Sequence, residues 1–192
     1  MNSKKFMAIS IIILALALLI GIAWWSYHLI DDNEPATEQK VITTNMKISS
    51  PAFAHNGVIP AKYTCEGEDI NPPLEFSDVP NNARSLSLIV DDPDAPAGTW
   101  VHWLVWNIDP SLGRISEGQR NSDSLEGTTS FGRTGYGGPC PPSGTHRYFF
   151  KLYALDTILN LPTSASNQDL EKAMQGHIIS QAELMGTYKK SK

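Results

Sequence analysis

The sequence predicts a mostly β domain of antiparallel strands with one packed helix near its C-terminus, preceded by a single membrane-spanning helix. Three runs rich in β-branched and aromatic residues, separated by turn residues, predict the strands. A long apolar run near the N-terminus predicts the membrane helix. Hydrophobic residues make up 41% of the chain and charged residues 18%, so the chain can fill a hydrophobic core.

The apolar run covers residues 6–25, FMAISIIILALALLIGIAWW, in which only Ser10 and Gly21 are not strongly apolar. About 20 helical residues span the ~30 Å hydrocarbon core of a bilayer. Lysines precede the run and acidic residues follow it. The positive-inside rule therefore places the N-terminus in the cytoplasm and the rest of the chain outside.

The chain divides into a cytoplasmic N-terminus (1–5), a transmembrane anchor (6–27), a polar linker (28–46), a folded domain (47–188) and a short tail (189–192). This organisation predicts a single-pass protein of the inner or plasma membrane. A cleaved signal peptide is the alternative, and it would make the domain secreted or periplasmic. The bulky sequence WWSYHLI after the run is unlike an A-x-A cleavage site.

Net charge and motifs restrict the function classes. The formal net charge is −5 and basic residues are scattered, whereas a nucleic-acid-binding protein needs a concentrated basic face. The sequence contains no G-x-S-x-G, H-E-x-x-H or P-loop pattern. We therefore predict neither a nucleic-acid partner, nor a catalytic residue, nor a cofactor.

The three strand-like runs are SLSLIV (85–90), WVHWLVWNI (100–108) and HRYFFKLYALD (146–156). Prolines interrupt the region between them and exclude long helices there. These are Pro72, Pro73, Pro80, Pro93, Pro96, Pro110, Pro139, Pro141 and Pro142.

One helix is predicted within residues 166–186, SNQDLEKAMQGHIISQAELMG. Ser166 is a candidate N-cap with Asp169 three residues later, and Gly186 is a candidate C-cap. A helical stripe between these caps is mostly apolar. It consists of Leu170, Ala173, Met174, His177, Ile178, Leu184 and Met185.

Cys65 and Cys140 are the only cysteines. Outside the inner membrane two thiols are commonly oxidised to a disulfide, which we favour here. Two separately buried thiols are the alternative, because sequence alone does not give the distance between them. A reactive cysteine is the least favoured interpretation.

The stretch GGPCPPSGTHRY (137–148) places a loop of glycines and prolines directly before a strand. Alternate residues of a strand share a face, so His146 and Tyr148 point the same way and Arg147 points oppositely. The glycines allow backbone N–H groups to converge, as in anion-binding nests. The combination suits a phosphate or carboxylate. A simple hairpin with a histidine at the strand edge is the alternative.

A second stretch, IVDDPDAPAGTWVHWLVWNI (89–108), carries Asp92 at the end of one strand and His102 in the next. Asp92 before a proline suits a turn cap, and His102 suits a core position between tryptophans. Trp100 and Trp106 share a strand face with His102, so they are candidates for a pocket wall or for core packing.

DDPDAP, TWVHWLVWNI and GYGGPCPPSGTHRYFFKLYALD together resemble the two signature blocks of the phosphatidylethanolamine-binding proteins. This family is also called the Raf kinase inhibitor family, and the chain is similar to its bacterial and archaeal branch over residues 47–188. The resemblance implies antiparallel sheets in a sandwich-like arrangement, with peripheral helices that include a C-terminal one. It also implies a small pocket for an anion or a phospholipid head group. Its residues would be Asp92, His102, Gly138, Pro142, His146 and Tyr148.

Three functions follow from these expectations. We favour a regulatory binding module for an anionic small molecule or a phospholipid head group, attached to the membrane by its N-terminal helix. The first alternative is an inhibitor of a protease or kinase, with a protein target. The second is a metal-dependent hydrolase, if Asp92, His102 and His146 converge on a metal. For the favoured function, we expect Asp92 to hydrogen-bond a pocket histidine and to favour its imidazolium form.

Overall fold

The structure is a computed structural model that describes residue 25, residues 45–119 and residues 123–191. The predicted N-terminus (1–5) and nearly all of the predicted anchor (6–27) and linker (28–46) lie outside the described residues. Among the residues that are described, no helix is both long enough and apolar enough to cross a bilayer.

The larger of two antiparallel sheets in the described part has the strand order β6-β4-β3-β7-β8. Its strands are β3 (Ser85–Asp92), β4 (Trp100–Ile108), β6 (Leu125–Glu126), β7 (His146–Leu155) and β8 (Ile178–Tyr188). The three strands predicted from composition are confirmed as β3, β4 and β7. Every residue of β3 is buried, because this strand lies at the centre of the sheet and is covered on both faces.

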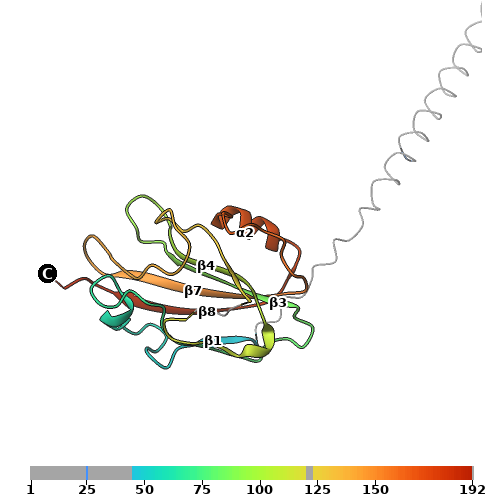
Figure 1. Cartoon of the computed structure of the whole chain (residues 1–192), viewed down its shortest axis with the longest axis horizontal. Helices are drawn as coiled ribbons and strands as arrows, with labels where there is room; N and C mark the ends of the chain where they lie inside the picture. Colours follow the sequence, from blue (N-terminus) through green and yellow to red (C-terminus); the bar gives the residue numbers. More distant parts are fainter. Residues whose placement is uncertain (1–24, 26–44, 120–122, 192) are drawn as a thin grey trace, which may run out of the picture. The chain divides into compact units, whose positions relative to one another are not determined.

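The smaller sheet has the order β1-β2-β5. It consists of β1 (Lys47–Ser49), β2 (Leu74–Ser77) and β5 (Arg114–Ile115), with short 3-10 helices η1 (Ala61–Tyr63) and η2 (Pro110–Leu112) in the connections. Its buried residues Ile48, Leu74 and Phe76 belong to the same core cluster as Leu88 and Phe150 of the larger sheet. The two sheets therefore pack face to face as the predicted sandwich (Figure 1).

The other face of the larger sheet is covered by helix α2 (Asn167–Met174), which lies opposite β1 in Figure 1. Leu170 and Met174 of the helix join Leu104 and Trp106 of β4 in a second core cluster. Ser166 caps the helix as predicted: its side chain accepts a hydrogen bond from the backbone of Asp169, and the Asp169 carboxylate accepts one from the Ser166 backbone.

The predicted extent of this helix is wrong beyond Met174. Gly176 adopts a positive φ of 78°, which ends the helical path. The residues from Ile178 onward form β8, which pairs with β7 from Leu155 back to His146. Gly186 is not a C-cap but a strand residue that pairs with Tyr148. A glycine is needed there because a Cβ atom would lie 2.6 Å from Cγ1 of Ile59. Pairing with β7 therefore outweighs the helical spacing of the apolar residues in this segment.

Two further predictions are wrong for the same reason. A strand follows α2, so the helix is not the C-terminal element, and the predicted apolar stripe does not continue along a helix beyond Met174. Leu184 is buried in the core between the sheets instead of on a helix face. His177 is exposed, and its Nδ1 lies 2.8 Å from Oδ1 of Asp156. The last element of the fold is therefore a strand at the edge of the larger sheet.

Candidate ligand-binding site

Two distant parts of the chain meet where β3, β4 and β7 lie side by side. Asp92 ends β3 and pairs with Trp100, the first residue of β4, while His146 begins β7. The Nδ1 atom of His146 lies 2.7 Å from Oδ2 of Asp92. The rings of His102 and Tyr148 meet edge to face with centroids 5.2 Å apart. The structure thus brings Asp92, His102, His146 and Tyr148 together.

A register shift in β4 accounts for the position of His102. Val90 pairs with Trp103 and Asp91 pairs with Val101, so His102 has no paired residue on β3. Such a bulge changes the direction of a side chain relative to strict alternation. Because of this bulge, the side chains of His102 and Trp106 do not share a face of the sheet, although strict alternation predicted that they would.

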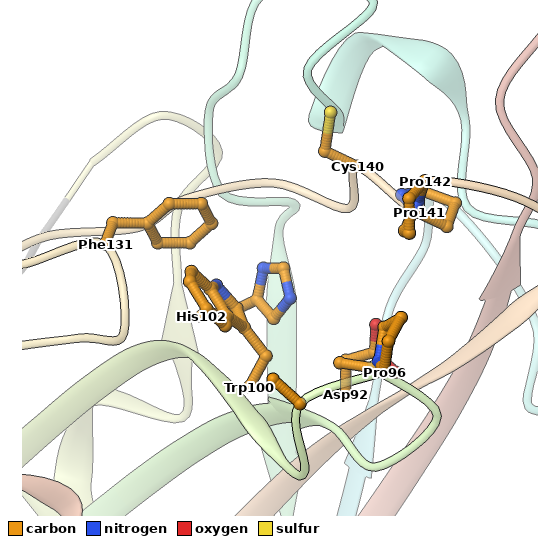
Figure 2. Close-up of a pocket in the computed structure, with 10 residues that line it drawn as sticks. Asp92, Pro96, Trp100, His102, Phe131, Cys140, Pro141 and Pro142 are labelled. Atoms are coloured by element: carbon orange, nitrogen blue, oxygen red, sulfur yellow. The ribbon is translucent and has the colours of Figure 1, made fainter.

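A cavity of about 370 Å³ opens at this point. Figure 2 shows two sides to it. Aromatic rings form one side, and prolines together with Asp92 form the other. The lining residues are Asp92, Ala95, Pro96, Ala97, Trp100, His102, Phe131, Cys140, Pro141 and Pro142. Asp92, His102 and Pro142 were predicted to bind ligand. His146, which bonds Asp92, and Tyr148, which packs against His102, are not among the lining residues.

Asp92 is held by hydrogen bonds from two directions. Its Oδ1 accepts the backbone N–H of Asp94 at 2.8 Å, and its Oδ2 is the partner of His146. Asp94 in turn binds Arg147 through two side-chain hydrogen bonds of 2.9 and 2.6 Å. These bonds lower the pKa of Asp94 to about 2. The positive charge of Arg147 is therefore committed to Asp94.

The tautomer of His102 follows from its backbone partner. Its Nδ1 lies 2.6 Å from the carbonyl oxygen of Gly137, and a carbonyl only accepts, so Nδ1 carries a proton. Nε2 is then the ring nitrogen that changes protonation. Burial lowers the pKa of His102, although the Gly137 carbonyl and the charge of Asp92 act in the opposite direction.

Asp92 forms the expected hydrogen bond with one of the two predicted pocket histidines. The histidine that Asp92 bonds is His146, which is outside the cavity lining. The histidine that lines the cavity, His102, is buried in a way that favours its neutral form. Asp92 therefore orients His146, and its charge only partly offsets the effect of burial on the pKa of His102.

Tyr148 is only 1% exposed. Its hydroxyl makes no hydrogen bond of normal distance and angle, although the Asp92 carboxylate is close enough to affect it. Burial first, and then the negative charge of Asp92, raise the pKa of Tyr148. The Tyr148 phenol therefore stays in its neutral, protonated form.

The glycines of the loop do not form the expected anion nest. The N–H of Gly138 donates to Oδ1 of Asp69 at 2.6 Å, and the N–H of Gly137 donates to the carbonyl of His102 at 3.0 Å. A Cβ atom on Gly138 would lie 2.5 Å from the carbonyl oxygen of Tyr63. Gly138 is needed for close packing, and it is absent from the cavity lining.

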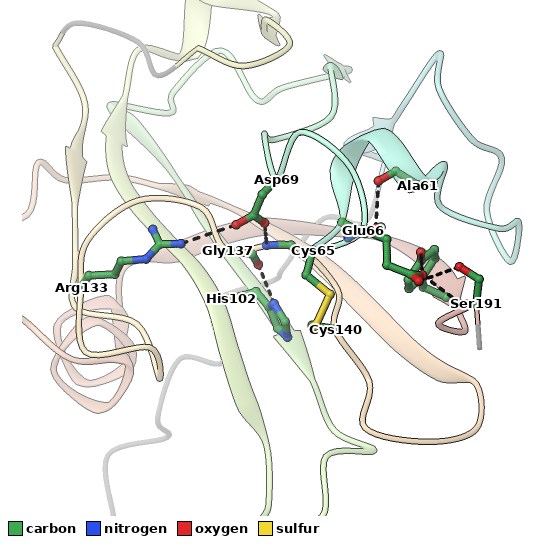
Figure 3. The surroundings of a disulfide bond; sticks show 12 residues. Ala61, Cys65, Glu66, Asp69, His102, Arg133, Gly137, Cys140 and Ser191 are labelled. Atoms are coloured by element: carbon green, nitrogen blue, oxygen red, sulfur yellow. Dashed lines mark hydrogen bonds and ion pairs between the residues drawn. A yellow bond between two sulfur atoms is a disulfide. The ribbon is translucent and has the colours of Figure 1, made fainter.

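Cys65 and Cys140 form a disulfide with a Cα–Cα distance of 5.4 Å, which confirms the favoured prediction. The bond ties the turn after η1 to the cavity wall, beside the ring of His102 (Figure 3). The two cysteines are 75 positions apart, and closing a loop of that length stabilises the fold by ~4 kcal/mol in the chain-entropy model. Because Cys140 lines the cavity, the bond also restricts movement of that wall.

Phe131 was not predicted to belong to the site, and the aromatic wall was predicted only in part. Phe131 is 40% exposed and meets both Trp100 and His102 edge to face. It lies in a glycine-containing loop between β6 and β7, and no periodicity marks it. Trp106 does not line the cavity, because it is fully buried in the cluster beneath α2.

The metal-site alternative receives no structural support. Asp92, His102 and His146 are close together, but Nδ1 of each histidine is already used by Gly137 or Asp92. Among residues 45–119 and 123–191, no group of three His, Cys, Asp or Glu side chains has an arrangement that could hold a metal ion.

The sequence matches a family model described as phosphatidylethanolamine-binding protein over residues 49–189. A UPF0098 protein of Methanothermobacter thermautotrophicus is 48% identical over 150 residues, covering 76% of this chain and 99% of the relative. A UPF0098 protein of Pyrococcus horikoshii is 53% identical over 155 residues, covering 76% of this chain and 77% of the relative.

Solved structures agree with these sequence relationships. A protein of Chlamydia trachomatis, reported as a homolog of phosphatidylethanolamine-binding protein, has a TM-score of 0.75 at 45% identity and covers 78% of this chain and 100% of its own. YbcL of Escherichia coli has a TM-score of 0.72 at 27% identity and covers 76% of this chain and 99% of its own. Taken with the matching family model, these archaeal and bacterial relatives show that the chain belongs to the phosphatidylethanolamine-binding protein family.

Proposed function

We propose that this chain is a ligand-binding module, attached to the inner or plasma membrane by residues 6–27, with its folded domain on the outer side. The observation that carries the proposal is the cavity between β3, β4 and the disulfide-linked loop. A cavity of about 370 Å³ lies within the usual size range of small-molecule sites. The apolar sequence of residues 6–25 supports the membrane attachment.

The proposed ligand has a small anionic head group, such as a phosphate or the head group of a phospholipid. The family name supports a phospholipid. His102 lines the cavity and supports an anion, because it becomes a donor at Nε2 when it is protonated. The charge of Asp92 acts against an anion, so we expect anion binding to require protonated His102.

A regulatory role is part of this proposal, because binding of a ligand to the cavity at the membrane surface can serve as a signal. Inhibition of a protease or kinase stays a sequence-based prediction. The domain would face the outer side, so a target there is expected to be extracytoplasmic.

A pH-dependent titration tests the anion proposal. The full-length chain in maltoside micelles is titrated with sulfate, an anion whose charge does not change in this range, at about pH 5.5 and about pH 7.5. NMR of the Trp100 indole N–H reports occupancy of the cavity. We expect sulfate affinity to rise several-fold at the lower pH, because protonation adds a positive charge and a donor to His102.

The His102→Gln variant should lose this pH dependence, because a glutamine does not titrate. His55→Gln is the matched control, since His55 is exposed and outside the cavity lining. Affinity that is the same at both pH values in the parent chain would refute the anion proposal.

A further inference from the structure

The loop that leads into β7 has two parts, which are held to the domain in different ways. The first part, residues 136–139, forms three hydrogen bonds with residues 63–69, at 2.6, 2.9 and 3.2 Å. Two of these bonds are donated by the Tyr136 hydroxyl and the Gly138 N–H. None of the three needs the disulfide. We therefore expect residues 136–139 to keep their position whether or not the cysteines are bonded.

The second part, residues 140–145, is held differently. Within the described part of the chain, residues 141–145 have no hydrogen-bonded partner. Gly144 adopts a φ of 71°, and a Cβ atom there would meet no heavy atom within 4 Å, so the end of this part lies in open space. The bond between Cys140 and Cys65 is therefore what fastens this part of the loop to the domain.

This second part also forms a wall of the cavity. Cys140, Pro141 and Pro142 are lining residues. Figure 2 shows them together on one side of the cavity, across from Phe131. The proline rings fix φ, so these residues keep their shape relative to one another when the segment moves. Release of Cys140 would therefore displace this wall as a unit.

A reductant in solution can reach the disulfide, because Cys65 and Cys140 are both exposed residues. In thiol–disulfide exchange, a thiolate of a dithiol attacks one sulfur, the bond between the cysteines breaks, and a mixed disulfide forms. The second thiol of the reductant then closes its own disulfide and leaves two protein thiols. In an oxidising compartment the bond is closed until such a dithiol is present.

We propose that the bond between Cys65 and Cys140 is a redox switch for the cavity. Reduction by a dithiol releases residues 140–145, the cavity wall becomes mobile, and ligand binding weakens. When only a fraction of the molecules has the wall in place, the apparent affinity falls in proportion to that fraction. The inference rests on the proposed function in taking this cavity as the ligand site, and it adds the regulation of that site.

Reduction of the full-length chain in maltoside micelles tests the release of the wall. Dithiothreitol is added at about pH 7.5, where part of it is thiolate. NMR relaxation is then measured for the backbone N–H groups of Cys140, Ser143 and Gly144. We expect their order parameters to fall from about 0.85 to below about 0.6. The N–H of Gly138, which is bonded to Asp69, should stay ordered. Oxidised dithiothreitol, which has no thiols, is the control reagent and should change nothing.

Sulfate affinity at about pH 5.5, with dithiothreitol still present, should fall at least about fivefold on reduction. A variant with both Cys65→Ser and Cys140→Ser should match the reduced chain, and dithiothreitol should not affect it further. Tyr136→Phe is the matched control, because it removes a hydrogen bond from the first part of the loop and keeps the disulfide. The order parameters of Ser143 and Gly144 and the sulfate affinity should stay near their parent values in this control.

The outcomes separate the inference from the proposed function. Unchanged order parameters on reduction overturn the inference, and so does loss of the NMR signals of β3 and β7, because the disulfide would then support the whole domain. If the serine variant does not fold, the reduced parent chain decides. A fall in order without a fall in sulfate affinity, in a chain that binds sulfate, also overturns it. If the oxidised chain binds no sulfate, the anion proposal is wrong, whereas a fall in the order of residues 140–145 still supports the redox switch.

Discussion

Asp91 and Asp92 are consecutive buried residues at the end of β3, and alternation sends their side chains to opposite faces of the sheet. Asp92 faces the cavity, and both of its oxygens have hydrogen-bond partners. Asp91 faces away, with Oδ2 held by Nζ of Lys151 at 2.6 Å and with Oδ1 lacking any hydrogen bond. Burial raises the pKa of Asp91, and Lys151 opposes this shift.

The difference shows that surroundings, rather than residue type or burial, separate a candidate binding carboxylate from a structural one. Asp92 is fixed by a backbone N–H and a histidine, and it borders open space. Asp91 depends on one lysine that is itself 32% exposed. A change on the Asp91 face should therefore affect stability alone, whereas a change on the Asp92 face should affect binding.

The largest expected change in stability, and the strongest test of the difference between Asp91 and Asp92, comes from Lys151→Met. Removing the lysine leaves the Asp91 carboxylate buried without its ionic partner, and the free energy of unfolding should fall by about 3 kcal/mol. Urea denaturation measures this change, with Lys172→Met on the exposed side of α2 as the control. Sulfate affinity at about pH 5.5 should stay at its parent value. A loss of binding in folded Lys151→Met would show that the two faces are not independent.

A smaller effect is expected from acid, and it concerns the cavity face. The folded-state pKa of His102 is lowered from about 6.5, so in that window the folded state binds fewer protons than the unfolded state. Stability from neutral His102 is therefore complete above pH 6.5 and is lost as the pH falls towards the lowered pKa. Each unit of lowering corresponds to about 1.4 kcal/mol.

Urea denaturation between about pH 5 and pH 7.5 measures this loss. His102→Gln should flatten the curve relative to the parent chain, because glutamine does not titrate. His55→Gln should keep the parent slope. An unchanged slope in His102→Gln would mean that another group causes the acid sensitivity.

The smallest effect is expected at the exposed pair beside the cavity. Arg147 is 53% exposed and Asp94 28% exposed at their side chains, so water screens the pair. Arg147→Ala should reduce the free energy of unfolding by less than about 1 kcal/mol. The same variant tests whether Arg147 contributes to binding, and sulfate affinity at about pH 5.5 should change by less than about twofold. A tenfold loss would place Arg147 in the binding site.

Local patterns predicted the strands that carry the site but not the strand that follows α2. Runs of β-branched and aromatic residues identify β3, β4 and β7, because those side chains fit a pleated, buried surface. The apolar residues from Leu170 to Met185 fit helical spacing equally well. Pairing of β8 with a strand about thirty positions earlier decided the outcome, and such pairing is not visible in a local window.

The site residues that lie at strand ends or in strands were predictable from local sequence, whereas those that loops bring to the cavity were not. Asp92 was expected to bond a pocket histidine, and a bond to His146 was found, but sequence did not reveal which histidine would line the cavity. The bulge at His102 and the Gly137 carbonyl decide that, and both are tertiary features. Phe131 reaches the cavity through a loop whose path no motif encodes.

The bond between Cys65 and Cys140 spans 75 positions, a segment that includes β2 through β6 and most of the cavity lining. A protease that cuts the chain once anywhere inside this segment leaves two polypeptides that remain covalently joined. Such a nicked molecule migrates as one species on a denaturing gel until a thiol reagent is added. The disulfide therefore keeps the domain in one covalent piece after a single backbone cut in this segment.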